Sequence, residues 1–300
     1  MNYLITGSNG LLGQKLLQKL KSIDCKIIAT SLGENKNPEI GFYTYENLDI
    51  TNQKKVNDII NKYQPNVIIN TAAITNVDLC EDKKDLCDLV NTTAVGYLAD
   101  AALKVGAHLI HISTDFIFDG KIGFYSEEDA PNPLSYYGES KLNSEKLLLN
   151  HNCMWSILRT IVIYGVGKNL EKNNIVLWAK NQLELGNSIN IIDDEFRAIT
   201  FAEDLAGACI STSSKKEFGI FHISGNELMS IYEIVERIAN FYKFDKSLIK
   251  RIKSAELNQK ARRPQKTGFN LEKARKKLDY SPTPFLESLE IIDKQLYKKY

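Results

Sequence analysis

Short apolar runs alternate with amphipathic stretches along the first half of the chain. The runs are rich in β-branched residues and are bounded by polar residues or glycine, a pattern typical of buried strands. Between them, leucines recur at helical spacing, as in Leu12, Leu16 and Leu20. We therefore predict strands over Tyr3–Thr6, Cys25–Thr30, Asn66–Asn70, His108–Ser113 and Trp155–Ile163, with intervening helices that include Val90–Val105 and Leu134–Asn150.

Strands that alternate with helices in this way form right-handed βαβ units and a parallel sheet covered on both faces. The predicted fold is α/β, a doubly wound Rossmann sheet with a smaller α/β C-terminal lobe. The pattern loosens after Gly165. We therefore expect two interleaved parts: a dinucleotide-binding domain over 1–163 plus 198–225, and a substrate-binding lobe over 164–197 plus 226–300.

Charge and composition exclude several classes of partner. The 38 basic and 37 acidic residues give a net charge of +1, which removes the electrostatic reason to expect nucleic acid or an anionic membrane surface. Residues 241–300 nevertheless carry 16 Lys and Arg against 7 Asp and Glu. This basic segment is either a solvated surface or part of a site for a small anion.

Cysteine spacing and hydropathy indicate the compartment. The five cysteines include no CxxC pair, and no Cys/His spacing suggests a metal site. No apolar run approaches the roughly 18 residues that a membrane-spanning helix needs. We expect a cytoplasmic protein with no bound metal and no membrane contact; a homodimer is compatible with the sequence.

The first candidate motif is a G-x-x-G-x-x-G turn between the first strand and the first helix. Glycines at this spacing let the backbone turn sharply, approach a pyrophosphate, and pack the helix against the sheet. The helix N-terminus then presents free N–H groups to the phosphates. The turn predicts dinucleotide binding by Gly7, Asn9, Gly10, Leu11, Leu12 and Gly13.

Cofactor choice is indicated at the end of the second strand. An acidic residue there binds the adenosine 2′-hydroxyl and repels a 2′-phosphate. This chain has Thr30 and Ser31 instead, with Lys36 close in sequence. Hydroxyl groups can donate to a phosphate, so NADP(H) is favoured over NAD(H), which stays possible.

A Y-x-x-x-K pair, Tyr137 and Lys141, is the second motif. Four-residue spacing places both side chains on one helix face, where the ammonium can lower the pKa of the phenol. Thr114 closes a predicted strand about two dozen residues earlier, where its hydroxyl points into the ligand crevice. These three residues are predicted to be catalytic, with Tyr137 donating a proton to a carbonyl oxygen.

The three motifs in this order resemble those of the extended short-chain dehydrogenases/reductases, and within them the dTDP-4-dehydrorhamnose reductase branch. The stretches that carry the resemblance are Asp49-Ile50, Asn70-Thr71-Ala72-Ala73, Ser113-Thr114-Asp115-Phe116-Ile117-Phe118-Asp119-Gly120, Pro133–Gly138 and Ala261-Arg262-Arg263-Pro264. The resemblance implies reduction of a 4-keto nucleotide sugar by a nicotinamide cofactor. Beside Ser31, and beside Tyr137 and Lys141, which also contact the cofactor in this prediction, it adds cofactor-binding roles for Asp49, Ile50, Ala72 and Ala73. It adds substrate-binding roles for Asp115, Phe116, Glu127, Arg197 and Arg263.

Related functions stay open at this point. The dehydratases of the superfamily carry Asp-Glu after the catalytic Thr, whereas Thr114 precedes Asp115 and Phe116 here. A nucleotide-sugar epimerase is an alternative. A cofactor-binding regulatory subunit, similar to that of methionine adenosyltransferase, is another, since Arg197 resembles what non-rhamnose relatives have at that position.

Overall fold

A seven-stranded parallel sheet forms the centre of the computed structural model, which describes residues 1–37, 39, 41–170 and 173–297. The first strand lies inside the sheet with the second and fourth strands on either side of it, so the direction of strand addition reverses there. This arrangement confirms the predicted doubly wound sheet. From edge to edge the strands are β12 (Gly219–Ile223), β7 (Met154–Thr160), β5 (His108–Thr114), β4 (Val67–Asn70), β1 (Asn2–Thr6), β2 (Lys26–Ser31) and β3 (Thr44–Asn47).

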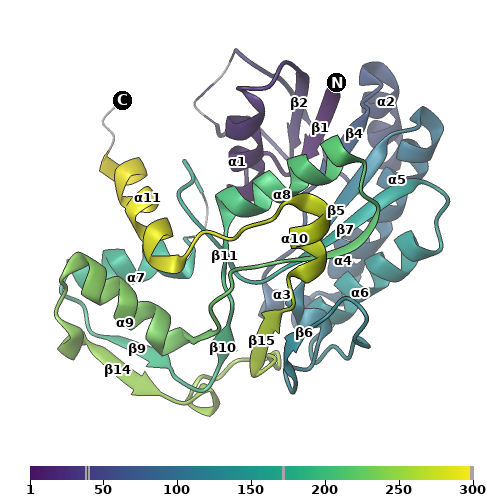
Figure 1. The fold of residues 1–300 in the computed structure, drawn as a ribbon. Helices are drawn as coiled ribbons and strands as arrows, with labels where there is room; N and C mark the ends of the chain where they lie inside the picture. Colours follow the sequence, from purple (N-terminus) through teal and green to yellow (C-terminus); the bar gives the residue numbers. More distant parts are fainter. Residues whose placement is uncertain (38, 40, 171–172, 298–300) are drawn as a thin grey trace.

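Helices cover both faces of this sheet (Figure 1). Apolar side chains from these helices pack on the strands in two buried clusters, one on each face of the sheet, whereas α6 also buries polar residues such as Lys141 and Glu145. One face carries α1 (Leu11–Leu20), α8 (Ala202–Lys215) and α10 (Glu272–Leu278). The other carries α2 (Gln53–Tyr63), α5 (Ala94–Val105) and α6 (Tyr136–Leu149), with the short α3 (Val77–Asp82), α4 (Lys84–Asp88) and the π-helical turn η1 (Leu89–Thr93) beside α6.

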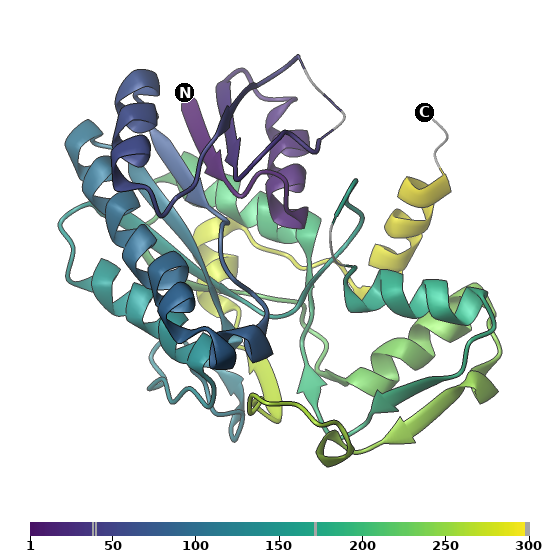
Figure 2. The same ribbon diagram turned by 180° about the vertical axis from the view of Figure 1, so that it is seen from behind.

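A second group of elements lies to one side of the sheet and has its own apolar core (Figure 2). Amphipathic α9 buries Ile234, Val235 and Ile238 against the neighbouring helices. The group contains α7 (Ile175–Glu184), β9 (Ile189–Ile192), α9 (Ile231–Tyr242), η3 (Lys246–Leu248), β14 (Ile249–Ile252), η4 (Ser254–Glu256) and α11 (Phe285–Tyr297).

Two small sheets connect these parts. A four-stranded sheet has the order β13 (Met229–Ser230), β10 (Phe196–Arg197), β15 (Lys266–Phe269) and β6 (Gly123–Tyr125), and thus joins segments far apart in sequence. A pair of short strands, β8 (Ile163–Tyr164) and β11 (Thr200–Phe201), forms the other. The division into two interleaved domains stays a prediction, and α10 packs with the main sheet.

The predicted strand Trp155–Ile163 is wrong at its C-terminal end. β7 stops at Thr160, and β8 begins only at Ile163, because Val162 has a φ of 28°. A β-branched residue rarely adopts a positive φ, so no extended strand can pass through this position. The chain instead turns there and pairs with β11.

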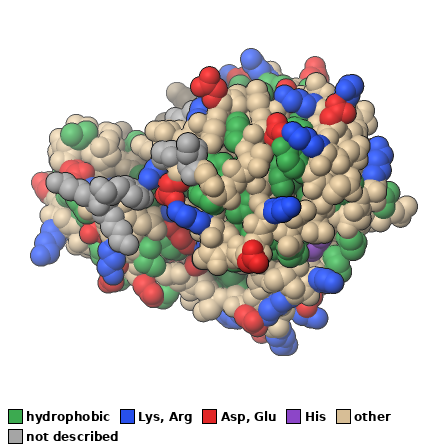
Figure 3. Space-filling model, turned by 90° about the horizontal axis from the view of Figure 1, so that it is seen from above, with side chains coloured by type: hydrophobic (Ala, Val, Ile, Leu, Met, Phe, Trp, Pro, Cys, Tyr) green, Lys and Arg blue, Asp and Glu red, His purple; other side chains and the backbone are tan. Residues whose placement is uncertain are grey.

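The surface carries charges of both signs. On the face seen in Figure 3, basic and acidic side chains are interspersed. No helix in the described ranges is both long and apolar enough to cross a bilayer.

Candidate active site

The glycine turn joins β1 to α1 and has the geometry that the motif predicts. Gly7 has a φ of 67°, and a Cβ there would lie 2.7 Å from Thr71 Oγ1 and 2.9 Å from Ala72 N. A Cβ on Gly13 would lie 2.5 Å from Gly7 O. The turn therefore fits tightly against both the end of β4 and its own helix, and it tolerates no side chain at either glycine.

Two features of this turn fit the pyrophosphate of a dinucleotide. Gly10 is the N-cap of α1 and has no side chain to occupy the first N–H groups of the helix, among them those of Leu11 and Leu12. Ser8 Oγ is buried and has no hydrogen-bond partner among the described residues. A buried hydroxyl without a partner is costly, and a phosphate oxygen would satisfy it.

Substitution of Gly13 by Ala is expected to destabilise the turn and weaken cofactor binding. The new methyl group would clash with backbone at Gly7 O and Ser8 Cα, at 2.5 and 2.6 Å, so α1 must move away from the turn. We expect a loss of about 1–3 kcal/mol in the free energy of unfolding, and at least a tenfold weaker NADPH affinity, about 1.4 kcal/mol. Chemical denaturation and calorimetric titration measure the two effects.

The matched control is Gly207→Ala in α8. A Cβ there would meet only the flexible end of Lys19, at 4.0 Å. An alanine in a helix interior is favoured over glycine, so this variant should be as stable as the parent or more so. Equal NADPH affinity in both variants would contradict the predicted role of Gly13.

Asn9 holds the segment after β2. Its Nδ2 donates to Glu34 O at 2.8 Å, and its Oδ1 accepts from Lys36 N at 3.0 Å. At the end of β2, the backbone oxygen of Ser31 accepts from Leu48 N, and Gly33 N donates to Asn47. Asn9 thus orders the loop beside the predicted position of the adenosine ribose.

The remaining predicted cofactor residues lie at neighbouring strand ends. Asp49 Oδ1 accepts from the backbone N and the hydroxyl of Thr51 just before α2, while Ile50 is buried. Ala72 and Ala73 directly follow β4, and Ala72 N lies beside Gly7. All of them belong to the carboxyl edge of the sheet, where ligands bind in this fold.

Thr114 ends β5, and Tyr137 stands in the first turn of α6. The Thr114 hydroxyl donates to Asp115 Oδ1 at 3.2 Å and accepts from Phe116 N. The Tyr137 ring packs edge-on against Phe116, with centroids 5.6 Å apart. The close packing of α6 against the turn after β5 requires Gly138, where a Cβ would lie 2.2 Å from Phe116 O.

Burial governs the acidity of Tyr137. It raises the pKa of Tyr137 above its ordinary range, and the hydrogen bond with Thr114 only partly opposes this. The expectation that Lys141 lowers this pKa is therefore not met in the protein alone, because desolvation dominates. The phenol therefore stays protonated at neutral pH, as its predicted role of proton donor requires.

Lys141 is buried one turn further along α6. Its Nζ donates to Ile112 O at 2.7 Å and lies 3.0 Å from His111 Nε2. Burial lowers the pKa of Lys141 to about 8, opposed by the charge of Glu145. An ammonium has three N–H donors, so after these two contacts one remains for Tyr137 or a ligand.

The predicted substrate residues Asp115 and Arg197 are both buried, and they contact each other. Arg197 Nη2 donates to Glu195 at 2.8 Å, and its Nε lies 4.0 Å from Asp115 Oδ2. That oxygen also accepts from Thr267 at 2.6 Å. This cluster links the end of β5 to the four-stranded sheet. Arg197 therefore has a structural role in addition to its predicted contact with the substrate.

Glu127 and Arg263 also have protein partners. Glu127 Oε1 accepts from His222 N at 2.9 Å, at the edge strand β12. Arg263 Nη2 donates to Asp78 Oδ2 at 2.8 Å, and so attaches the loop before β15 to α3. Arg263 keeps 17% of its side chain exposed. Both contacts join segments that are far apart in sequence.

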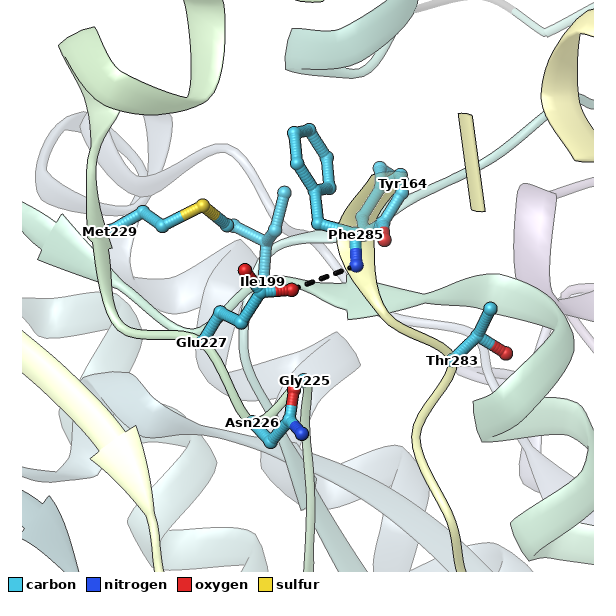
Figure 4. A pocket seen from close by; sticks show the side chains of 8 residues that line it. All are labelled: Tyr164, Ile199, Gly225, Asn226, Glu227, Met229, Thr283 and Phe285. Atoms are coloured by element: carbon cyan, nitrogen blue, oxygen red, sulfur yellow. Dashed lines mark hydrogen bonds between the residues drawn. The ribbon is translucent and has the colours of Figure 1, made fainter. Parts of the chain in front are cut away.

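A small pocket between the two groups of elements lies apart from these predicted residues (Figure 4). Its lining includes Tyr164, Met229 and Phe285, and the Glu227 carboxylate accepts there from Phe285 N at 2.9 Å. It contains none of the candidate catalytic residues.

Sequence reasoning missed residues that surround the predicted catalytic pair, Tyr137 and Lys141. His111 contacts Lys141, while the thiols of Cys80 and Cys87 form a buried cluster with Tyr137. Cys87 Sγ also lies 3.2 Å from Ser140 Oγ. Only one signal pointed to His111, its position three residues before Thr114 on a predicted strand. No sequence signal pointed to the two cysteines, because they come close to Tyr137 only in the folded chain.

Comparison with known proteins gives one family for nearly the whole chain. Residues 1–297 match the family model described as RmlD substrate binding domain. A dTDP-4-dehydrorhamnose reductase of Aggregatibacter actinomycetemcomitans is 33% identical over 302 residues, which cover 96% of this chain and 97% of the relative.

The chain is also similar to a protein with a different name and to a reductase of known structure. Methionine adenosyltransferase 2 subunit beta of Rattus norvegicus is also 33% identical, over 255 residues that cover 83% of this chain and 74% of that one. The crystal structure of dTDP-4-dehydrorhamnose reductase from Bacillus anthracis in complex with NADP has a TM-score of 0.84 and 27% identity. That match covers 98% of this chain and 99% of the other.

Proposed function

Because the chain belongs to the RmlD substrate binding domain family, we propose that it is an NADP(H)-dependent reductase of a 4-keto nucleotide sugar. The observation that carries the proposal is the position of Thr114, Tyr137 and Lys141. Thr114 lies at the carboxyl end of β5, and Tyr137 and Lys141 lie in the first two turns of α6, which packs against β5; β4 alone separates β5 from β1, the strand that enters the glycine turn. A bound nicotinamide supplies the hydride for such a reduction.

In this proposal Tyr137 donates its proton to the oxygen of the keto group. Thr114 can donate to the same oxygen once its hydroxyl turns away from Asp115. Lys141 uses its one remaining N–H to hold the cofactor ribose, while its ammonium charge acts on Tyr137 from the same helix face. Phe116 borders Tyr137 and excludes water from the proton donor.

The cofactor preference rests on residues around Ser31. No acidic side chain stands at Thr30 or Ser31, so a 2′-phosphate is not repelled there. The relative from Bacillus anthracis was crystallised with NADP. We propose NADP(H) as the cofactor, bound by the domain over 1–163 plus 198–225, with the nucleotide sugar held by the lobe over 164–197 plus 226–300.

Glu127 and Arg263 are proposed on the sugar side and the diphosphate side of the substrate. Arg263 has a planar guanidinium suited to phosphate oxygens, and part of it reaches solvent beside Asp78. Binding of a diphosphate would then compete with the Asp78 contact. Asp115, Phe116 and Arg197 complete the proposed substrate set around Thr114.

The test is turnover with authentic keto-sugar substrates. The purified chain is incubated with NADPH or NADH and with 4-keto sugars carried on dTDP, GDP or UDP. The proposal expects oxidation of NADPH and a product two mass units heavier than the substrate. Product formation without net consumption of NADPH would instead indicate an epimerase.

The similarity to methionine adenosyltransferase 2 subunit beta supports a second candidate, a cofactor-binding regulatory subunit. It predicts NADPH binding without turnover on any member of the sugar panel. It also predicts a stoichiometric complex with a partner enzyme, measured by size-exclusion chromatography with light scattering. Turnover on a keto sugar excludes this candidate as the sole function.

A further inference from the structure

A row of four buried polar side chains begins at Lys141 and runs under the sheet edge. Lys141 Nζ lies 3.0 Å from His111 Nε2, and His111 Nδ1 lies 3.1 Å from Asn70 Nδ2. Asn70 Oδ1 accepts from Thr6 Oγ1 at 2.6 Å. Each of the four is at most 2% exposed. Because solvent does not reach them, their polar groups need hydrogen-bond partners within the protein, either in the row or on its immediate neighbours.

The imidazole in the middle of the row stays neutral. Burial and the charge of Lys141 hold the pKa of His111 well below its usual range. A neutral imidazole has one N–H donor and one acceptor nitrogen, so the contact made at one nitrogen dictates what the other can do.

With Lys141 as an ammonium, only one arrangement of hydrogen bonds gives both ring nitrogens of His111 a matching partner. The ammonium donates to Nε2, so the His111 proton is on Nδ1. Asn70 must then accept the Nδ1 proton with its side-chain oxygen and donate its amide N–H to Thr6 Oγ1. This requires the side-chain amide of Asn70 to rotate by half a turn, because its Nδ2 lies towards His111 and its Oδ1 towards Thr6 in the structure. Ser144 Oγ, 3.1 Å from Nε2, donates to Lys141 O at 2.6 Å and does not compete.

With Lys141 as a neutral amine, the other pattern fits. Asn70 Nδ2 donates to Nδ1, and Thr6 donates to Asn70 Oδ1, as their positions indicate. The His111 proton is then on Nε2, from which it is donated to the Lys141 nitrogen or to Ser144 Oγ. An ammonium facing this N–H would place two donors 3.0 Å apart.

We propose that the charge of Lys141 and the tautomer of His111 change together, which makes His111 a positioning residue for the Tyr137–Lys141 pair. Loss of one proton from the ammonium to solvent accompanies transfer of the His111 proton from Nδ1 to Nε2, so four protons on the two side chains become three. The kinetic consequence of this coupling rests on the proposed reductase function, whereas the coupling itself does not.

Other titratable groups face the pair from each neighbouring element. Tyr137 and Glu145 lie on α6 itself, and Cys87 approaches from α4. Arg159 on β7 neutralises Glu145 through a 2.7 Å ion pair. Among these groups His111 makes the closest contact with the ammonium, after the backbone oxygen of Ile112.

Nitrogen NMR of the cofactor-free protein tests the coupling directly. Histidine labelled with ¹⁵N on the ring reports which nitrogen carries the proton, and His111→Gln identifies the His111 signals among the four histidines. Between pH 6 and 10 we expect the His111 proton to move from Nδ1 to Nε2, with a midpoint near the Lys141 pKa of about 8. Lys141→Met should fix the Nε2–H tautomer at every pH.

Kinetics with matched variants gives the second measurement. His111→Leu removes the acceptor, so the alkaline limb of the kcat/KM profile should move down by about one to two pH units. His111→Gln keeps an acceptor oxygen near the position of Nε2. The alkaline limb of its kcat/KM profile should therefore stay within about half a pH unit of that of the parent.

The coupling between the Lys141 charge and the His111 tautomer can be rejected independently of the positioning role of His111 in turnover. A His111 tautomer that stays constant while Lys141 titrates, or an imidazole that becomes charged in this range, overturns the coupling whatever the enzyme does. Equal alkaline limbs in the Leu and Gln variants overturn the positioning role. Absence of turnover in the parent with a normal tautomer change would reject the proposed function and leave the coupling intact.

Discussion

Replacement of Tyr137 by phenylalanine is expected to lower kcat for reduction of a 4-keto nucleotide sugar by about 10²–10⁴-fold. The change removes the only atom of the side chain that can protonate the keto oxygen. It leaves the ring and its edge-on contact with Phe116 in place. NADPH affinity should stay close to that of the parent, because the glycine turn between β1 and α1 is untouched. Stopped-flow kinetics and calorimetric titration separate the two quantities.

The neighbouring Tyr136 provides a matched control. Its hydroxyl donates to Asp88 at 2.5 Å, so Tyr136→Phe makes the same chemical change on the same helix away from Thr114. Turnover of this variant should stay within a few-fold of the parent. Full activity in Tyr137→Phe, or an equal loss in both variants, would reject Tyr137 as the proton donor.

The parts of the site with local sequence signals were predictable. The glycine turn is specified by three residues within seven, and its geometry follows from backbone sterics alone. Tyr137 and Lys141 are one helical turn apart, so a helix over that segment was enough to place them together. The parallel, doubly wound character of the sheet followed from the alternation of strands and helices, whereas the order of its strands came from the structure.

Contacts across the chain were not predictable in the same way. The family resemblance assigned Arg197 and Arg263 to the substrate, yet their distant protein partners Asp115 and Asp78 become visible only in three dimensions. The partner of Arg263 is 185 residues away. A single sequence carries no signal for such a pairing.

Very short strands and local backbone strain were not predictable from the sequence either. β6 and β15 have three and four residues, too few for a periodic pattern, and they exist because they pair with each other and with β10. Val162 gave no warning of its positive φ, since valine is typical of strands. The break after β7 is imposed by the pairing of β8 with β11.

Arg159 on β7 and Glu145 on α6 form a buried ion pair, and breaking it should produce the largest change in stability. Arg159 Nη2 and Nε both donate to Glu145, the former at 2.7 Å, and the side chains are only 3% and 1% exposed. Glu145 also accepts from Ser113 Oγ at 2.5 Å, which connects the pair to β5. Arg159→Met leaves this carboxylate without its cation in the interior. We expect a loss of about 3–5 kcal/mol in the free energy of unfolding, measured by urea denaturation.

Two comparisons separate the ion pair from simple loss of packing. The double variant Glu145→Leu/Arg159→Met removes both charges, so it should be clearly more stable than Arg159→Met, because no unpaired charge stays buried. Lys54→Met breaks the exposed pair between Lys54 and Asp58 and should leave the unfolding midpoint unchanged. A double variant no more stable than Arg159→Met would show that Arg159 acts through its packing on Phe118 instead, where its guanidinium lies 5.4 Å from the ring centroid. Glu145 lies one turn after Lys141 on α6, and its charge acts on the pKa of Lys141. Arg159→Met should therefore also shift the alkaline limb of the pH profile of kcat/KM, whereas Lys54→Met should not.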